Sequence, residues 1–150
     1  MSDIKALLEF SQTQPWEAEK RLAYRWDCYN KHLNFMGPED LGTCRVTLDL
    51  CQELLTQEQA SDALPLVRGV LQVFESRFDG LQAPVFEAKL LLAQALIGAG
   101  KEDLGRSVFR ELSNAIEGRP DEEALRGCLE IAQAVLPVDN CVVLRPDFKR

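Results

Sequence analysis

The sequence has little that would support catalysis, cofactor binding or membrane insertion. It contains one histidine, His32, and no CxxC pair. It has neither a GxGxxG nor a GxxxxGK[ST] motif, so it lacks the usual phosphate-binding loops of nucleotide enzymes. No run approaches the roughly 20 apolar residues of a membrane-spanning helix. We therefore expect no cofactor and no membrane span.

The cysteines do not form the pattern of a secreted disulfide protein. There are five, an odd number, whereas disulfide frameworks normally have an even number in a shorter chain. The first residues, Met1 to Lys5, lack a basic stretch followed by an apolar run, which predicts that no secretory signal is present. We expect a cytoplasmic protein whose thiols act mainly as small buried apolar groups.

Basic residues are too few for a protein that binds phosphate-rich surfaces. Lys and Arg total 17 against 24 Asp and Glu, so the net charge is −7. Binding of nucleic acid or of an anionic membrane requires a basic patch, and neither is expected as a partner. An acidic field favours encounter with a basic protein. The run of carboxylates between Pro38 and Asp62 is most simply a solvated helix face.

The chain does contain apolar residues at helical spacing. In the second segment they recur every three or four residues, which is the signature of one buried helix face. These residues are Leu22, Trp26, Tyr29, Leu33 and Met36. Glycine, proline or a short polar turn separates seven such segments, and short turns between them favour antiparallel neighbours. The predicted helices are Ile4–Phe10, Pro15–Phe35, Pro38–Thr56, Ala60–Phe78, Pro84–Ala99, Glu102–Glu117 and Asp121–Leu136.

Two features modify this all-α prediction. Pro65 is tolerated only in the first turn of a helix, so a start of the fourth helix at Ser61 or Asp62 is the alternative to a start at Ala60. The β-prone run Cys141–Leu144 has no partner strand in a helical chain. We expect a single domain over residues 1–136 and an extended tail over residues 137–150. The tail packs against the last helices or, alternatively, is an exposed hook for a partner.

The stretch Phe86–Ile116 carries small and large residues at the offsets of a recurrent helical hairpin. Ala93 and Gly105 are small where the two helices would approach closely, and Phe109 follows on the second helix. This order resembles the tetratricopeptide repeat. The departures from that pattern are Leu96 for its tyrosine, Lys89 for its tryptophan and Leu112 for its usual alanine.

A weaker copy of the same pattern precedes it. The interval from Cys51 to Ala63 equals the interval from Ala93 to Gly105, and the offset between the copies is 93 − 51 = 42. The standard repeat is shorter, at about 34 residues. The resemblance covers residues 41–136 and implies a right-handed superhelix, with a generic antiparallel bundle as the alternative.

The seventh helix departs further from the repeat. Arg126 and Glu130 occupy positions that are apolar in the pattern, so we expect this helix to be a terminal cap.

The resemblance also implies a binding groove. In tetratricopeptide-repeat proteins the first helix of each pair lines a concave surface that binds an extended peptide or a partner helix. Transferred by position, the candidate partner-binding residues are Arg45, Leu48, Gln52, Leu55, Glu87, Leu90, Gln94 and Ile97. Leu48, Leu90 and Ile97 would then be exposed among polar neighbours. Alternatively, the second helix fills the groove and these residues belong to the core.

Candidates for chemistry centre on Cys28. His32 follows it on the same helix face, and Cys44 and Cys51 lie on the next predicted helix. Zinc normally takes four ligands presented as close pairs on turns, so we expect no metal site. A Cys–His nucleophile pair needs an oxyanion hole, for which no glycine-rich setting is present. We expect no catalytic residue and no enzyme.

These observations favour a non-catalytic protein that masks or chaperones a specific protein partner. A toxin-immunity type inhibitor is the preferred hypothesis, because a basic toxin would explain the acidic charge. A secretion or assembly chaperone and a structural homodimeric subunit are the alternatives.

Overall fold

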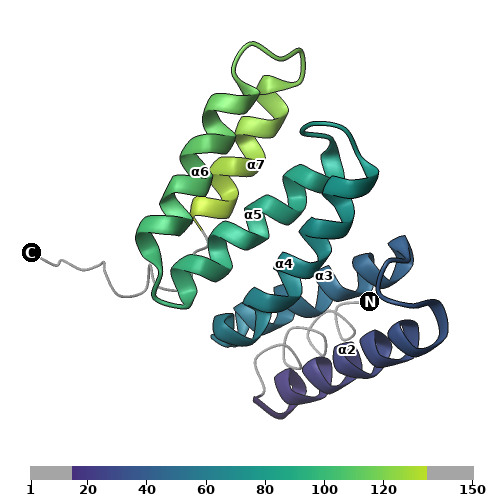
Figure 1. Ribbon diagram of the computed structural model, residues 1–150. Coiled ribbons are helices and arrows are strands. Elements are labelled where there is room, and N and C mark those ends of the chain that lie inside the picture. Colours follow the sequence, from purple (N-terminus) through teal and green to yellow (C-terminus); the bar gives the residue numbers. More distant parts are fainter. Residues whose placement is uncertain (1–14, 135–150) are drawn as a thin grey trace, which may run out of the picture.

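The computed structural model describes residues 15–134, which form six α-helices without a strand (Figure 1). The predicted all-α class is thereby confirmed. The predicted first helix, Ile4–Phe10, and the tail over residues 137–150 lie outside the described residues. The helices are α2 (Pro15–Met36), α3 (Leu41–Thr56), α4 (Ala60–Arg77), α5 (Ala83–Gly98), α6 (Glu102–Ile116) and α7 (Glu122–Ala134).

The predicted start of α3 was wrong, and of the two starts predicted for α4 the later one, at Ser61 or Asp62, was wrong. The α3 helix begins three residues after Pro38, because the Asp40 side chain caps it by accepting a hydrogen bond from the Thr43 N–H at 3.1 Å. The α4 helix begins at Ala60, so Pro65 lies beyond its first turn. Proline removes one helical hydrogen bond, and the exposed position of Pro65 lets water reach the carbonyl that loses its partner.

The helices form two layers. Each helix packs against the next, while α3 also contacts α5 and α5 also contacts α7 (Figure 1). The inner layer therefore consists of α3, α5 and α7, and the outer layer of α2, α4 and α6.

Two buried clusters meet in α5. Its residues Val85 and Leu91 belong to a cluster shared with α3 and α4, and α2 packs against that cluster. Phe86 and Ile97 belong to a second cluster, shared with α6 and α7. The α5 helix has buried apolar residues on more than one side, as central helices do, and it therefore joins the two ends of the molecule.

The two central helical pairs are copies in register. The first helices α3 and α5 begin and end at the same interval, since 83 − 41 and 98 − 56 both equal 42, and the second helices begin at that interval too. We call this interval the repeat offset. Glu58 and Gly100 are related by it, and they take positive φ angles of 60° and 90° in the connecting turns. We call residues 37–78 unit 1 and residues 79–120 unit 2.

An arginine closes each unit. At the end of α4, Arg77 Nη2 donates to the Glu39 carbonyl, which precedes α3, at 2.6 Å. After α6, Arg119 Nη1 donates to the Leu81 carbonyl, which precedes α5, at 3.0 Å. The two donors are related by the repeat offset, and so are the two acceptors, which makes the contacts equivalent.

Close helix approach also occurs where it was predicted. A Cβ placed on Gly105 would lie 2.5 Å from Ile97 Cγ1 and 2.7 Å from the Ala93 carbonyl oxygen. The equivalent position of unit 1 has Ala63, whose carbonyl accepts from Cys51 Sγ at 3.7 Å. Small residues therefore hold the helices of both units together.

Candidate protein-binding surfaces

Three of the eight predicted partner-binding residues belong to the core. Leu48 and Ile97 are 1% exposed and Leu55 is 6% exposed. The expectation that Leu48 and Ile97 are exposed was wrong. Leu48 and Leu55 belong to a buried cluster against which α2 packs through Leu22, Trp26 and Tyr29. For these two residues the alternative prediction holds, namely that the second helix fills the groove and that they belong to the core.

Three other predicted residues lie on the inner layer. Gln94 Nε2 donates to the Ala132 carbonyl at 2.9 Å and so ties α5 to α7. Leu90 is half-buried against the second cluster, and Gln52 is exposed. Gln94 and Leu90 thus have structural contacts already.

Arg45 and Glu87 remain, and they face each other across the two units. They are equivalent residues, and Arg45 Nη2 lies 2.9 Å from Glu87 Oε2. Arg45 Nη2 also lies 3.2 Å from Asp49 Oδ1, while Arg25 Nη1 is more distant from Asp49 Oδ2, at 3.8 Å. The hydrogen bond to Glu87 raises the pKa of the Arg45 guanidinium. Glu87 therefore shares the cation of Arg45 with a second carboxylate.

An apolar hollow of about 260 Å³, which we call the inner pocket, lies beside this ion pair. Phe74 and Phe78 form part of its wall, with ring centroids 5.7 Å apart in an edge-to-face arrangement. Leu41, Ala83 and Pro84 complete the apolar lining, and Arg45 and Glu87 form the charged part. Its size suits one large apolar side chain.

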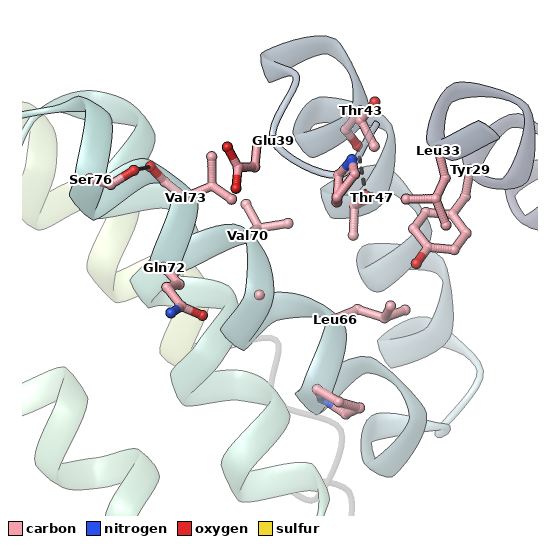
Figure 2. A pocket seen from close by; sticks show the side chains of 13 residues that line it. Tyr29, Leu33, Glu39, Thr43, Thr47, Leu66, Val70, Gln72, Val73 and Ser76 are labelled. Carbon is pink, nitrogen blue, oxygen red and sulfur yellow. Dashed lines mark hydrogen bonds between the residues drawn. The ribbon is translucent and has the colours of Figure 1, made fainter. Parts of the chain in front are cut away.

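A larger hollow of about 520 Å³, which we call the outer groove, lies between α2 and α4 (Figure 2). Thr43 and Thr47 of α3 form its floor, and both hydroxyls donate to main-chain carbonyls, at 3.3 Å and 2.7 Å. Tyr29 and Leu33 line it from α2, and Leu66 and Val73 line it from α4.

The inner pocket and the outer groove lie on opposite faces of α3. Leu41 and Arg45 line the pocket, while Thr43 and Thr47 line the groove. Two positions along an α-helix correspond to a rotation of about 200°. The same helix therefore supports two separate surfaces.

Unit 2 has its own version of the outer groove, a hollow of about 400 Å³ that includes residues of α4, α5 and α6. Val85 and Lys89 line this hollow at the positions that Thr43 and Thr47 occupy in unit 1. Lys89 Nζ lies 3.9 Å from Glu75 Oε2. The charged Lys89 thus lines the hollow in unit 2, whereas the equivalent residue of the outer groove is the smaller, uncharged Thr47.

The side chains considered for chemistry are used structurally. His32 Nδ1 donates to the Cys28 carbonyl, not to its thiol, at 3.0 Å. Cys44 and Cys51 are buried, and burial raises the pKa of both thiols, that of Cys51 to about 12. Over residues 15–134, no three potential metal ligands cluster together.

Sequence reasoning missed both hollows. In α4, Leu66 and Val73 form a second apolar edge with Gly69 between them. Leu41, at the start of α3, is 43% exposed. An apolar edge beside a mid-helix glycine was the available signal.

No protein-family model matches the chain, and neither the curated proteins nor the solved structures include a significant match. The resemblance to the tetratricopeptide repeat accordingly stays a prediction. None of the helices within residues 15–134 is long and apolar enough to cross a membrane.

Proposed function

We propose that this protein is a non-catalytic protein-binding module that receives a large apolar side chain of its partner in the inner pocket. The observation that supports this most is the placement of the pocket. It lies where α3, α4 and α5 meet, and its lining includes both the exposed Leu41 and the Arg45–Glu87 pair. An apolar cavity with a polar margin is the usual form of an anchor site at protein interfaces.

The charge of the protein suggests which partner fits. Both carboxylate oxygens of Glu87 bind Arg45, at 3.1 Å and 2.9 Å, but the Glu87 side chain is 39% exposed, so a cation of a partner can still approach it. The net charge of −7 attracts a basic partner over a longer range. We therefore propose a partner segment with an apolar side chain next to a lysine or arginine.

Within this class, masking of a basic toxin in the cytoplasm is the task that we propose. A rigid, acidic helical scaffold suits a toxin-immunity type inhibitor, and the same scaffold would suit a chaperone. The proposal predicts that co-expression of this protein with a toxin encoded by a neighbouring gene restores growth. Growth that is equally poor with and without this protein would contradict the immunity role.

The inner pocket is tested by Leu41→Asp, measured by calorimetric titration of the toxin. A carboxylate at the pocket disfavours an apolar side chain, and we expect affinity to fall by at least tenfold. Leu104→Asp on α6 is the matched control, since Leu104 is 56% exposed and lies outside the inner pocket. Equal affinities of the two variants, with unchanged helicity, would refute the pocket as the anchor site.

The dependence of binding on salt tests the charged part of this proposal separately from the apolar anchor. If Glu87 meets a basic partner, the association rate should fall steeply as ionic strength rises from about 0.01 to 0.15 M. A rate that is independent of salt would show that the partner is not basic. A mass that doubles with concentration in light scattering, and that Leu41→Asp returns to monomer, would favour the homodimer instead.

A further inference from the structure

The outer groove is open at positions where the hollow of unit 2 carries charged side chains. Thr47 stands where unit 2 has Lys89, and Gly69 stands where unit 2 has Glu111, because each pair is related by the repeat offset. The groove is also the larger of the two hollows, at about 520 Å³ against 400 Å³. The helices and the closing arginine contacts of the two units are equivalent. The replacement of charged side chains by Thr47 and Gly69 is therefore a difference between the two hollows and not between the frameworks of the units.

Gly69 is not needed for packing within residues 15–134. It lies inside α4, where glycine is less favourable than alanine. A Cβ at this position would meet no atom within 4 Å, and the φ angle is an ordinary helical one. Gly69 therefore contributes an open stretch of helix surface, which allows another chain to approach closely.

The polar groups of the groove favour a cationic occupant. Glu39 is the one charged residue among those that line it. Its main-chain carbonyl accepts from Arg77, but its carboxylate forms no ion pair or hydrogen bond with another residue of the described part of the chain. The carboxylate lies beside the apolar side chains of Val70 and Val73 (Figure 2). An unpaired carboxylate beside an apolar wall complements a lysine or arginine next to an apolar face.

The walls favour a helix over an extended strand as the occupant. The α2 and α4 helices satisfy their main-chain groups internally and offer no strand edge. An extended peptide would leave its own N–H and C=O groups without partners against Leu33, Leu66 and Val73, whereas a helix satisfies them itself. Figure 2 shows Leu33 of α2 and Leu66 of α4 reaching into the open space from opposite sides.

We propose that the outer groove is a second binding site, which receives the apolar face of a basic amphipathic helix from a partner protein. The helix would place apolar side chains between α2 and α4, over the floor formed by Thr43 and Thr47, and pair a lysine or arginine with Glu39. This site lies across α3 from the inner pocket and does not depend on the function proposed for that pocket.

The probe for this site is a fluorescein-labelled synthetic peptide of leucine, alanine and lysine, with leucines at helical spacing of three and four. We expect saturable binding to the full-length protein and amide NMR shifts at Thr43, Gly69 and Val73. Gly69→Glu copies the residue of unit 2 and should weaken binding at least tenfold. Gly127→Glu is the charge-matched control, because Gly127 is also inside a helix with no atom within 4 Å of its Cβ position.

Two further comparisons test the chemistry of the occupant. Glu39→Gln should weaken the lysine peptide several-fold and leave a peptide with glutamine in place of lysine unaffected. A version interrupted by prolines, which cannot form a helix, should bind at least tenfold more weakly. Equal binding of the helical and proline-interrupted peptides would overturn the proposed helix.

The two sites are distinguishable in this experiment. Equal affinity of Gly69→Glu and Gly127→Glu, or no saturable binding at all, overturns the second site. Amide shifts confined to Leu41 and Phe78 also overturn it, because they place the peptide in the inner pocket. Leu41→Asp should leave binding of the peptide unchanged if the outer groove is its site.

Discussion

At the scale of single residues, burial determines what the cysteines can do. Cys51 is fully buried between α3 and α4, where its Sγ donates to the Ala63 carbonyl, and burial raises its pKa to about 12. Cys128 on α7 is exposed. The thiolate is the reactive form, so these two thiols should differ widely in reactivity although they belong to one small domain.

Alkylation at pH 8 measures this difference. An ordinary thiol has a pKa of about 8.5, so a pKa of about 12 lowers the thiolate fraction by roughly a thousandfold. We expect iodoacetamide to modify Cys128 within minutes and Cys51 only after unfolding, as followed by peptide mass spectrometry. Comparable labelling of both residues in the folded protein would contradict the buried position of Cys51.

The same thiol makes stability depend on pH. Between about 8.5 and 12 the unfolded chain releases the Cys51 proton and the folded chain keeps it. The folded state then binds more protons, so the free energy of unfolding should fall as pH rises through this range. Cys51→Ala should make that fall shallower in urea titrations at pH 8 and pH 10.

At the scale of helices, two glycines illustrate opposite uses of the same residue. Gly105 allows α6 to touch the main chain of α5, since its Cβ position lies 2.7 Å from the Ala93 carbonyl oxygen. Gly69 on α4 has no such neighbour. The first glycine is required by packing and the second opens the outer groove.

Alanine substitutions separate these uses. Gly105→Ala should destabilise the protein by about 1–3 kcal/mol, because α6 must move away from a main-chain atom. Gly69→Ala should stabilise it by about 0.5–1 kcal/mol, since alanine favours the helix and meets open space. Urea unfolding measures both, and a destabilising Gly69→Ala would show that the glycine has a packing role.

The positions of the helices could be predicted from the sequence, but which face of each helix is buried by a neighbouring helix could not. The spacing of five residues predicted a buried stripe on α2, and Leu22, Trp26 and Tyr29 do pack against the core. Met36, at the end of the predicted stripe, is 60% exposed, so the prediction was wrong there. Periodicity does not tell which of several apolar faces a neighbour covers. For that reason Leu48 was placed on a binding surface, whereas it is 1% exposed in a cluster against which α2 packs.

The repeat was more informative than the family resemblance. The offset of 42 residues was inferred from small residues expected at helix contacts. In the structure these residues do lie where the two helices of each unit meet. The apolar edge beside Gly69 could have been recognised in the sequence, but the two hollows themselves could not be predicted, because each depends on three helices meeting. Of the predicted site, Arg45 and Glu87 line the inner pocket.

At the scale of the whole molecule, α5 links the two units. It contributes to both buried clusters, so we expect a loss of packing in one cluster to affect the other. The tyrosines and tryptophans all precede unit 1 in the sequence, and the second cluster lies at the other end of the molecule. Spectroscopic signals from one end should therefore report on changes at the other.

Leu112→Ala tests this cooperativity. Leu112 is buried in the second cluster, and its truncation should cost about 2–5 kcal/mol. We expect the urea midpoints from tryptophan fluorescence and from circular dichroism to coincide and to fall together. A tryptophan transition that keeps its wild-type midpoint would show that the two ends unfold independently.

The register of the two units makes the molecule modular. Each unit has an arginine near its end, Arg77 or Arg119. This arginine donates to a carbonyl near the start of the same unit, that of Glu39 or Leu81. A tandem insertion of residues 79–120 after Pro120 would thus present to α7 the same helices that it contacts now. The polar outer side of α7, with Glu123 and Glu130, would still terminate the longer array. We therefore expect that the number of units can be changed. Protein engineers could use this to build a protein whose inner layer has a chosen number of helices.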